Sequence, residues 1–294
     1  MRDENDRPSH DDRMETGESQ LSGLELEAGE DRSTARRWIR RAEEILPVLA
    51  LAAMTLLPLA EIVARRLGTG VPGAASFTQH LTLWVTFLGA ALAAREGKLL
   101  SLATTSFWRE GPWRRFAEIF AGAVGAGVTA ILFRASLELV DVEREFGSTL
   151  ALDVPVWLAQ AVMPVGFALI ALRLAWRASE RWWGRFLGFA GLGIGLWLGQ
   201  MPGLLEGRPD WPGVALILVA TALGSPIFAV LGGFAVLFFM TDGVPLAAVP
   251  SETYRLATSP LLAAIPLFTL TGFLLAEGDS SRRLVRVFRA WFGF

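Results

Sequence analysis

The chain of 294 residues is 52% hydrophobic and only 19% charged, and its mean hydropathy is positive. This composition is typical of an integral membrane protein, because a soluble chain of this length could not bury several uncharged runs of about 20 residues. The chain has no cysteine and two histidines, which excludes thiol chemistry and His/Cys metal cages, and we expect no bound metal and no covalent cofactor. The net charge of −2 does not indicate a nucleic-acid partner.

The first 35 residues are polar and contain eleven acidic residues and four arginines. They show no apolar period, so we predict a disordered acidic tail at residues 1–35, with no signal peptide before the membrane segments. A basic amphipathic turn then surrounds Trp38 and Ile39, and we interpret it as an anchor at the surface of the lipid bilayer.

Five apolar segments follow, and each is long enough to cross a hydrocarbon core of ~30 Å at ~1.5 Å per residue. The predicted segments are residues 45–63, 77–94, 116–140, 154–176 and 186–203. They predict an all-α, multi-pass membrane fold.

The basic residues predict the orientation of these segments. Arginine and lysine are concentrated in the loop at 95–115 and the stretch at 173–185, whereas the loop at 141–153 carries four acidic residues against one arginine. By the positive-inside rule, the N-terminus and the two basic loops are cytoplasmic, and the acidic loop faces outward. Arg65 and Arg66 count against this orientation, because they fall outside. The fifth segment must then carry the chain outward again.

Residues 211–240 are apolar but are interrupted by Gly224-Ser225-Pro226, so they form either one kinked helix or a helical hairpin. One helix would be about 45 Å long, too long for most bilayers without a kink, and two helices would be short. A single crossing would export the four arginines between 282 and 289, whereas a hairpin would leave them inside. Length favours one helix and charge favours the hairpin, which we adopt.

Small residues mark one face of the fifth segment. Gly191, Gly195 and Gly199 follow one another at four-residue spacing, which lets a second helix approach closely. We predict that they pack against a neighbouring helix or a second copy of the chain. Glycine is also simply common in membrane helices.

Ionisable residues at membrane depth are candidate functional residues. Glu61 lies near the end of the first segment, and Arg134 and Glu138 lie one turn apart in the third, where they can form a pair. All three can reach the interface, so we expect structural roles. The segments contain no carboxylate pair, serine–base arrangement or phosphate loop, and we therefore predict no catalytic residue and no enzyme activity.

Four residues are candidate helix breaks, since proline deletes a helix hydrogen bond and glycine loosens the backbone. They are Gly224, Pro226, Pro266 and Gly272. Broken helices are concentrated in transporters, where exposed helix ends can face a substrate or an ion, but prolines also occur in inert membrane helices.

Two blocks of sequence carry a family resemblance. WVTFLGAALAAREGKL at 84–99 and TLALDVPVWLAQAVMPVGFALIALRL at 149–174 resemble the small four-helix membrane subunit of tripartite ATP-independent periplasmic (TRAP) transporters. The positions that carry it are Trp84, Phe87, Gly89, Arg95, Gly97, Leu152, Pro155, Trp157, Pro164, Gly166 and Phe167.

A third block, SPLLAAIPLFTLTGFLLAEGDSSRRLV at 259–285, resembles the start of the large permease subunit of the same system. Phe273 departs from that pattern, since it replaces a frequent asparagine. The matching positions are Leu262, Ile265, Pro266, Phe268, Gly272, Gly278 and Leu284.

The resemblance implies a fusion of the two subunits. Residues 1–35 would be the acidic cytoplasmic tail, 36–180 the small-subunit four-helix bundle, 181–206 a linking transmembrane helix, and 207–294 the truncated start of an elevator-type permease. The ending FRAWFGF, without a polar tail, favours truncation.

The resemblance also implies a function in the bacterial cell inner membrane. The family imports an organic acid, such as a C4-dicarboxylate or a sugar acid. A periplasmic substrate-binding protein delivers the acid, and a sodium gradient drives its import. The hairpins that hold substrate and sodium are expected beyond Phe294, so the substrate-binding residues are unknown and the remainder of the permease is an expected partner. A non-transporting membrane scaffold or sensor subunit is the alternative. Substrate identity and oligomeric state cannot be read from the sequence.

Overall fold

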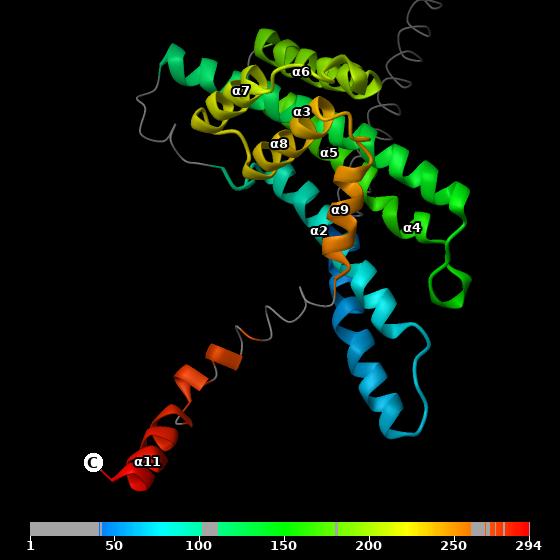
Figure 1. Cartoon of the computed structure of the whole chain (residues 1–294), viewed down its shortest axis with the longest axis vertical. Helices are drawn as coiled ribbons and strands as arrows, with labels where there is room; N and C mark the ends of the chain where they lie inside the picture. The colour runs from blue at the N-terminus through cyan, green and yellow to red at the C-terminus, as the bar shows by residue number, and fades with distance from the viewer. Residues whose placement is uncertain are drawn as a thin grey trace, which may run out of the picture. The chain divides into compact units, whose positions relative to one another are not determined.

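The computed structural model describes residues 41, 43–101, 111–179, 182–259, 268, 271–273, 275–278 and 280–293. These residues are helical apart from turns, loops and two isolated β-bridges (Figure 1). The chain divides into two compact units, Met1–Val48 and Leu49–Phe294. The acidic tail predicted for residues 1–35 lies outside the described residues.

Four described helices are long and apolar enough to cross a membrane, which confirms the first four predicted segments. They are Glu43–Arg66, α2 (Ala74–Glu96), α3 (Pro112–Phe146) and the pair Val156–Arg177, in which α4 (Val156–Gln160) and α5 (Val162–Arg177) meet at Ala161. The fifth predicted segment is helical as α6 (Trp182–Gln200), but α6 is not one of the four described helices that are long and apolar enough to cross a membrane. Its crossing of the membrane stays a prediction.

The helices of the bundle alternate in direction. The Trp84 indole N–H, near the middle of α2, donates to the Ala159 carbonyl of α4 (3.1 Å), and Arg177 near the end of α5 donates to the Arg95 carbonyl at the C-terminal end of α2 (2.6 Å). Hence α2 runs in the same sense as α4 and α5. Gly122 of α3 lies against Ala178, at the end of α5, so α3 runs in the opposite sense.

These directions separate the charges of the bundle. At one end α2 and α5 finish and α3 begins, and we call it the basic end. Its charged residues are mainly Arg95, Lys98, Arg114, Arg115 and Arg177. At the other end α3 finishes and α4 begins, next to η2 (Ala151–Asp153), and we call it the acidic end. It carries Glu138, Asp141, Glu143, Glu145 and Asp153. The charge asymmetry used to predict orientation is therefore an asymmetry between the two ends of a packed bundle.

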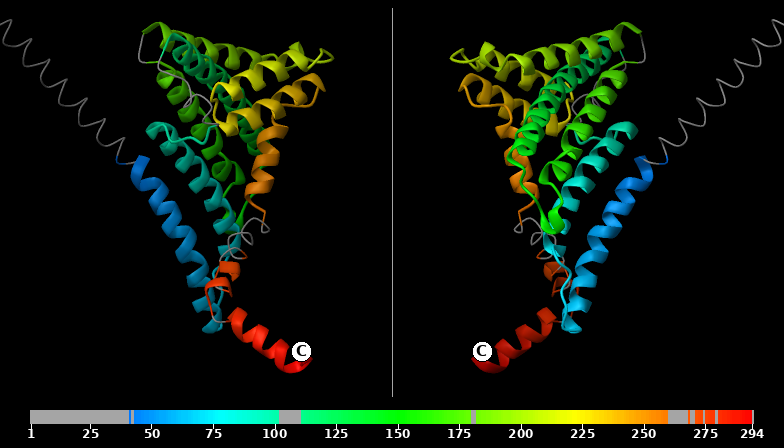
Figure 2. Two further views of the ribbon diagram at one scale, coloured as in Figure 1. Left: turned by 90° about the vertical axis from the view of Figure 1, so that its left-hand side faces the viewer. Right: turned by 90° about the vertical axis from the view of Figure 1, so that its right-hand side faces the viewer.

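Residues 211–241 form a helical hairpin, so the prediction of a hairpin is confirmed and a single kinked helix is wrong. After η3 (Pro202–Leu204), helix α7 (Trp211–Ala222) leads to a turn and α8 (Ile227–Thr241) returns beside it (Figure 2). Gly224 sits in the turn with φ +94°, a left-handed conformation that favours glycine. The Gly207 N–H donates to the Thr241 carbonyl (3.0 Å), which ties the two ends of the hairpin together.

Two further helices follow the hairpin. Helix α9 (Ala248–Ala257) packs against α2, α3 and α8, and α11 (Ser280–Phe292) ends the described chain. The main apolar core joins the bundle to the segment after it. Leu83 of α2 and Met163 of α5 are fully buried in it beside Met240 of α8 and Leu246, just before α9.

Candidate functional site

The glycines of α6 lie directly on the backbone of α3. A Cβ atom built on Gly195 would overlap the Gly127 carbonyl oxygen and lie 2.7 Å from the Gly127 Cα, and one built on Gly191 would lie 3.0 Å from the Ala123 Cα. These distances are far below ordinary carbon–carbon contact of about 3.5–4.0 Å. The partner atoms belong to the backbone and cannot rotate away. Close packing of α6 on α3 therefore depends on the absence of side chains at these two positions.

The third glycine of the stripe has a milder contact. A Cβ on Gly199 would lie 3.2 Å from the Cβ of Arg134, whose side chain can adjust. Because residue 191 meets 123 and residue 195 meets 127, α6 runs in the same sense as α3 along this contact. Gly193, on the other side of α6, faces away from α3, since a Cβ added there would meet no atom within 4 Å.

The hairpin docks on the same helix. A Cβ on Gly233 of α8 would lie 3.2 Å from Val128 of α3, and the buried Ser225 of the hairpin turn faces Gly125. The Ile227 N–H donates to the Leu100 carbonyl (2.9 Å), so the turn is also held by the loop after α2. The predicted helix breaks Gly224 and Pro226 thus form the tip of an element that is seated on the bundle.

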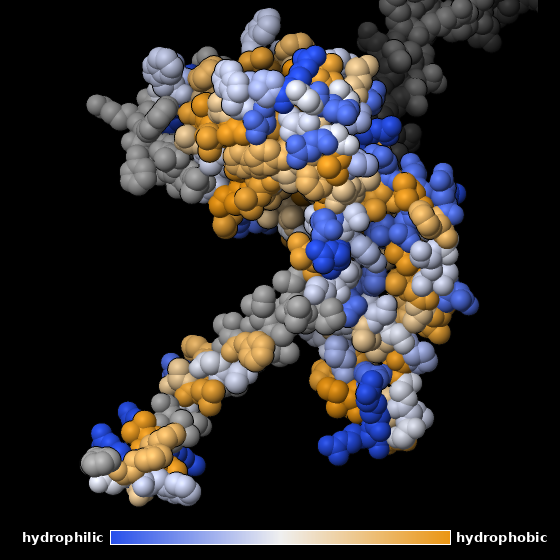
Figure 3. All heavy atoms as spheres, in the orientation of Figure 1, coloured by the Kyte–Doolittle hydropathy of each residue, from blue (hydrophilic) through white to orange (hydrophobic). Residues whose placement is uncertain are grey.

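An apolar cavity of about 540 Å³ lies between α3, α6 and the hairpin. Phe120, Ile194 and Leu237 are typical of its walls, and apolar side chains also cover the hairpin face in Figure 3. A carboxylate needs hydrogen-bond donors or a cation, and these walls supply almost none. We assign no substrate site to this cavity.

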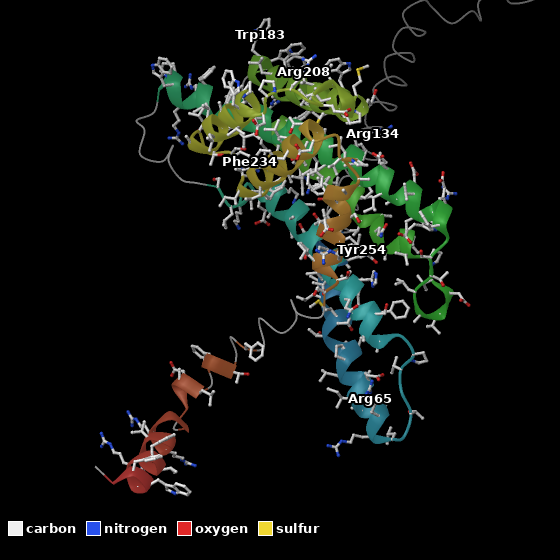
Figure 4. The ribbon with its side chains drawn as sticks, in the orientation of Figure 1. Arg65, Arg134, Trp183, Arg208, Phe234 and Tyr254 are labelled. Carbon is white, nitrogen blue, oxygen red and sulfur yellow. The ribbon has the colours of Figure 1, made fainter. Side chains whose placement is uncertain are left out.

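A buried polar cluster connects α9 to the acidic end of the bundle. His80 of α2 is 7% exposed, and its Nε2 lies 2.6 Å from the hydroxyl of Tyr254. Figure 4 labels Tyr254 on α9. The His80 Nδ1 lies 2.7 Å from the Ser76 carbonyl, which can only accept. In a neutral imidazole Nδ1 therefore carries the proton, and the Tyr254 hydroxyl donates to Nε2. Gln160 of α4, 1% exposed, hydrogen-bonds to the same hydroxyl.

Burial and a nearby carboxylate change the pKa of the Tyr254 phenol. Burial raises the pKa of Tyr254, the nearby carboxylate of Glu143 raises this pKa further, and the hydrogen bond from Gln160 lowers it. The Gln160 Oε1 atom is buried and has no partner among the described residues. Sequence reasoning did not find this cluster. Its signals were weak, namely a lone histidine near the start of a span and the only tyrosine of the chain.

We expect the single tyrosine to titrate above its ordinary pKa of about 10 in the folded chain. A raised pKa means that docking favours the neutral phenol, so this contribution to stability is complete below about pH 10 and is lost as the pH rises through the folded pKa. Phenolate absorbance, followed against pH in the folded and the denatured chain, measures the shift. Glu143→Gln should lower the folded midpoint. Equal midpoints in the two states would contradict the docked position of Tyr254.

Two of the predicted intramembrane ionisable residues, Glu61 and Arg134, make contacts that hold parts of the fold together. The Glu61 carboxylate accepts from the Arg65 side chain (2.6 Å) and from the Val71 N–H (2.6 Å), and so holds the loop after the first span against the end of that helix. Among the described residues, no ion pair joins Arg134 to Glu138, although their spacing allows one. Both side chains are exposed, and the stem of Arg134 packs at Gly199 instead.

Two predicted helix breaks lie in the stretch before α11. Gly272 falls in a short helical piece, where an added Cβ would meet no atom within 4 Å, and Pro266 lies outside the described residues. In the part of the chain that the structure describes, no group of three histidine, aspartate or glutamate side chains could hold a metal ion.

The fold and these contacts define a class: an all-helical membrane protein with four helices that are long and apolar enough to cross a membrane, in which a helical hairpin packs on α3. Residues 54–184 match the family model of the DctQ component of tripartite ATP-independent periplasmic transporters. A DctQ domain, the small membrane component of TRAP transporters, therefore occupies these residues, and the resemblance to the small subunit is confirmed. No curated protein and no solved structure matches the chain.

Proposed function

We propose that the chain is a membrane component of a sodium-gradient-driven TRAP transporter, in which the small subunit is fused to the start of the large permease subunit. The observation that carries the proposal is the DctQ domain at residues 54–184, followed by a helix and a hairpin that dock on it. Residues 36–180 form the small-subunit domain, 181–206 the linking helix and 207–294 the first part of the permease. The protein lies in the bacterial inner membrane with its N-terminus in the cytoplasm.

The packing of α6 supports the role of a linking helix. Gly184 and Gly188 of α6 lie against Ser179 and Ala175 at the end of α5, so α6 starts at the basic end and runs opposite to α5. The small-subunit domain ends at the basic end, and α6 then runs from that end along the same bundle toward the acidic end. The hairpin then leaves the side of the membrane unchanged, because its two ends are tied at Gly207 and Thr241.

The substrate in this proposal is an organic acid that a periplasmic binding protein delivers. We place the substrate and sodium sites in the remainder of the permease, since the apolar cavity beside α6 offers no carboxylate partner. Residues 207–294 then extend the scaffold against which the transporting domain moves. The docked hairpin is the structural basis for that rigid role.

Complementation tests the assignment of roles. A strain that lacks the whole transporter but retains its binding protein receives either residues 1–294 alone or the same residues together with the cognate large permease. Residues 1–294 alone are expected to give no sodium-dependent uptake of the organic acid, and the second strain is expected to recover it. Robust uptake by residues 1–294 alone would show that the substrate site is misplaced.

The alternative, a non-transporting scaffold or sensor, makes the opposite prediction for the acidic tail. If residues 1–35 recruit a cytoplasmic partner, their deletion should abolish function while the helical core tolerates change. In a transporter the deletion should leave uptake intact, and disruption of the α3–α6 contact should remove it. The same uptake assay distinguishes the two functions.

A further inference from the structure

The last described helix, α11, separates its charges from its large apolar side chains. It carries Arg282, Arg283, Arg286 and Arg289 and no acidic residue. At about 100° per residue, the four arginines fall within an arc of about 120°. Val285, Val287, Phe288, Trp291 and Phe292 fall within an arc of about 160° on the opposite side. In Figure 3 this part of the chain shows blue and orange side chains together.

The apolar face of α11 is exposed. Trp291 is 83% exposed and Phe292 62%, and the rings of Phe288 and Phe292 stack on each other at 5.7 Å rather than inserting into another described helix. The arginines are exposed as well. An apolar face of this size requires a cover of matching chemistry.

Two kinds of cover fit poorly. A membrane-spanning position is excluded by length and charge, because 13 residues reach only about 20 Å and would bring four arginines into the hydrocarbon. A groove on a soluble partner would cover the apolar face but would leave the arginine face without a counterpart.

The interface of a bilayer matches both faces at once. There the apolar side chains enter the boundary between headgroups and acyl chains, and a row of arginines meets the phosphate layer. The chain supplies the bilayer itself, since four of its other helices can cross one. The absence of acidic residues from α11 removes repulsion by negatively charged headgroups.

We propose that α11 lies in the plane of the membrane surface and binds anionic phospholipid. Val287 and its apolar neighbours enter the acyl boundary, and the four arginines bind lipid phosphates. This inference depends on the membrane position of the chain and not on the identity of the transported substrate.

The test uses the full chain in lipid nanodiscs. Because the chain has no cysteine, single-cysteine variants can be labelled directly with a fluorophore that reports its environment. Val287→Cys marks the apolar face, and Ala290→Cys marks the arginine face without removing a charge. Quenching by brominated acyl chains is compared with quenching by aqueous iodide, in neutral phosphatidylcholine discs and in discs that also contain phosphatidylglycerol.

In anionic discs the label at 287 should be quenched mainly by the brominated lipid, and the label at 290 mainly by iodide. In neutral discs, or at high salt, lipid quenching at 287 should fall severalfold. In the Val287→Cys chain, Arg282→Gln with Arg286→Gln should reproduce that loss in anionic discs. The matched pair Arg282→Lys and Arg286→Lys should retain most of the quenching.

Three results would overturn the proposal. Protection of position 287 from both quenchers would mean that a protein surface covers the apolar face. Strong iodide quenching at both positions would place the whole helix in water. Lipid quenching that is equal in neutral and anionic discs would remove the role of the arginines in lipid selection.

Discussion

Replacement of Gly195 by alanine is expected to destabilise the helical bundle by about 2–3 kcal/mol, a large effect for one methyl group. The added Cβ would overlap the Gly127 carbonyl oxygen and lie 2.7 Å from the Gly127 Cα. Since backbone atoms cannot rotate away, α6 and α3 must separate. That separation would remove packing contacts along the whole α3–α6 interface and loosen the walls of the neighbouring cavity. Equilibrium unfolding of the full chain in detergent micelles, followed by tryptophan fluorescence, measures the loss.

The matched control lies two residues away on the same helix. A Cβ added at Gly193 would meet no atom within 4 Å, so Gly193→Ala should leave the free energy of unfolding unchanged or raise it by up to ~1 kcal/mol, because alanine favours the helix. Gly199→Ala should fall between the two, since its neighbour is the adjustable side chain of Arg134. Equal effects at 193 and 195 would mean that α6 does not pack on α3 through this face.

Cysteine labelling from outside the cell is expected to separate reactive positions from positions that react hardly at all. Arg208→Cys and Asp242→Cys should react with a membrane-impermeant maleimide in intact cells, whereas Lys98→Cys and Trp183→Cys should not. This result follows from the proposal that α6 carries the chain across the membrane between 183 and 208, and from the hairpin, whose two ends are tied together by the bond from Gly207 to Thr241. All four side chains are exposed in the structure.

Two controls make this result interpretable. The natural chain has no cysteine and should give no labelling, and permeabilised cells should label all four variants. If Trp183→Cys and Arg208→Cys react from the same side, α6 is not a crossing helix and the linking role fails. If Arg208→Cys and Asp242→Cys react from opposite sides, one arm of the hairpin crosses the membrane instead of returning.

Local sequence patterns predicted the first five helical segments and the hairpin, but neither α9 nor α11. The lengths of the uncharged runs predicted the first four spans, because hydrocarbon thickness sets a minimum helix length that hardly depends on neighbours. The arginine-rich and acid-rich loops predicted which helix ends lie together. The turn at Gly224-Ser225-Pro226 predicted the break between α7 and α8, since proline and left-handed glycine act on the backbone within a few residues.

The tertiary structure decided which elements touch. The spacing of Gly191 and Gly195 predicted a close neighbour but not that it is α3, and nothing local shows that the hairpin is seated on that helix. The His80–Tyr254 contact joins residues 174 positions apart, and the stem of Arg134, whose spacing from Glu138 would allow a pair, packs at Gly199. By itself the sequence determined the first five helical segments, the hairpin, their approximate ends and the charge asymmetry of the bundle, because periodicity and composition act over short range. Which helix packs on each helix face was decided only by the tertiary structure, because several helices can compete for the same apolar surface.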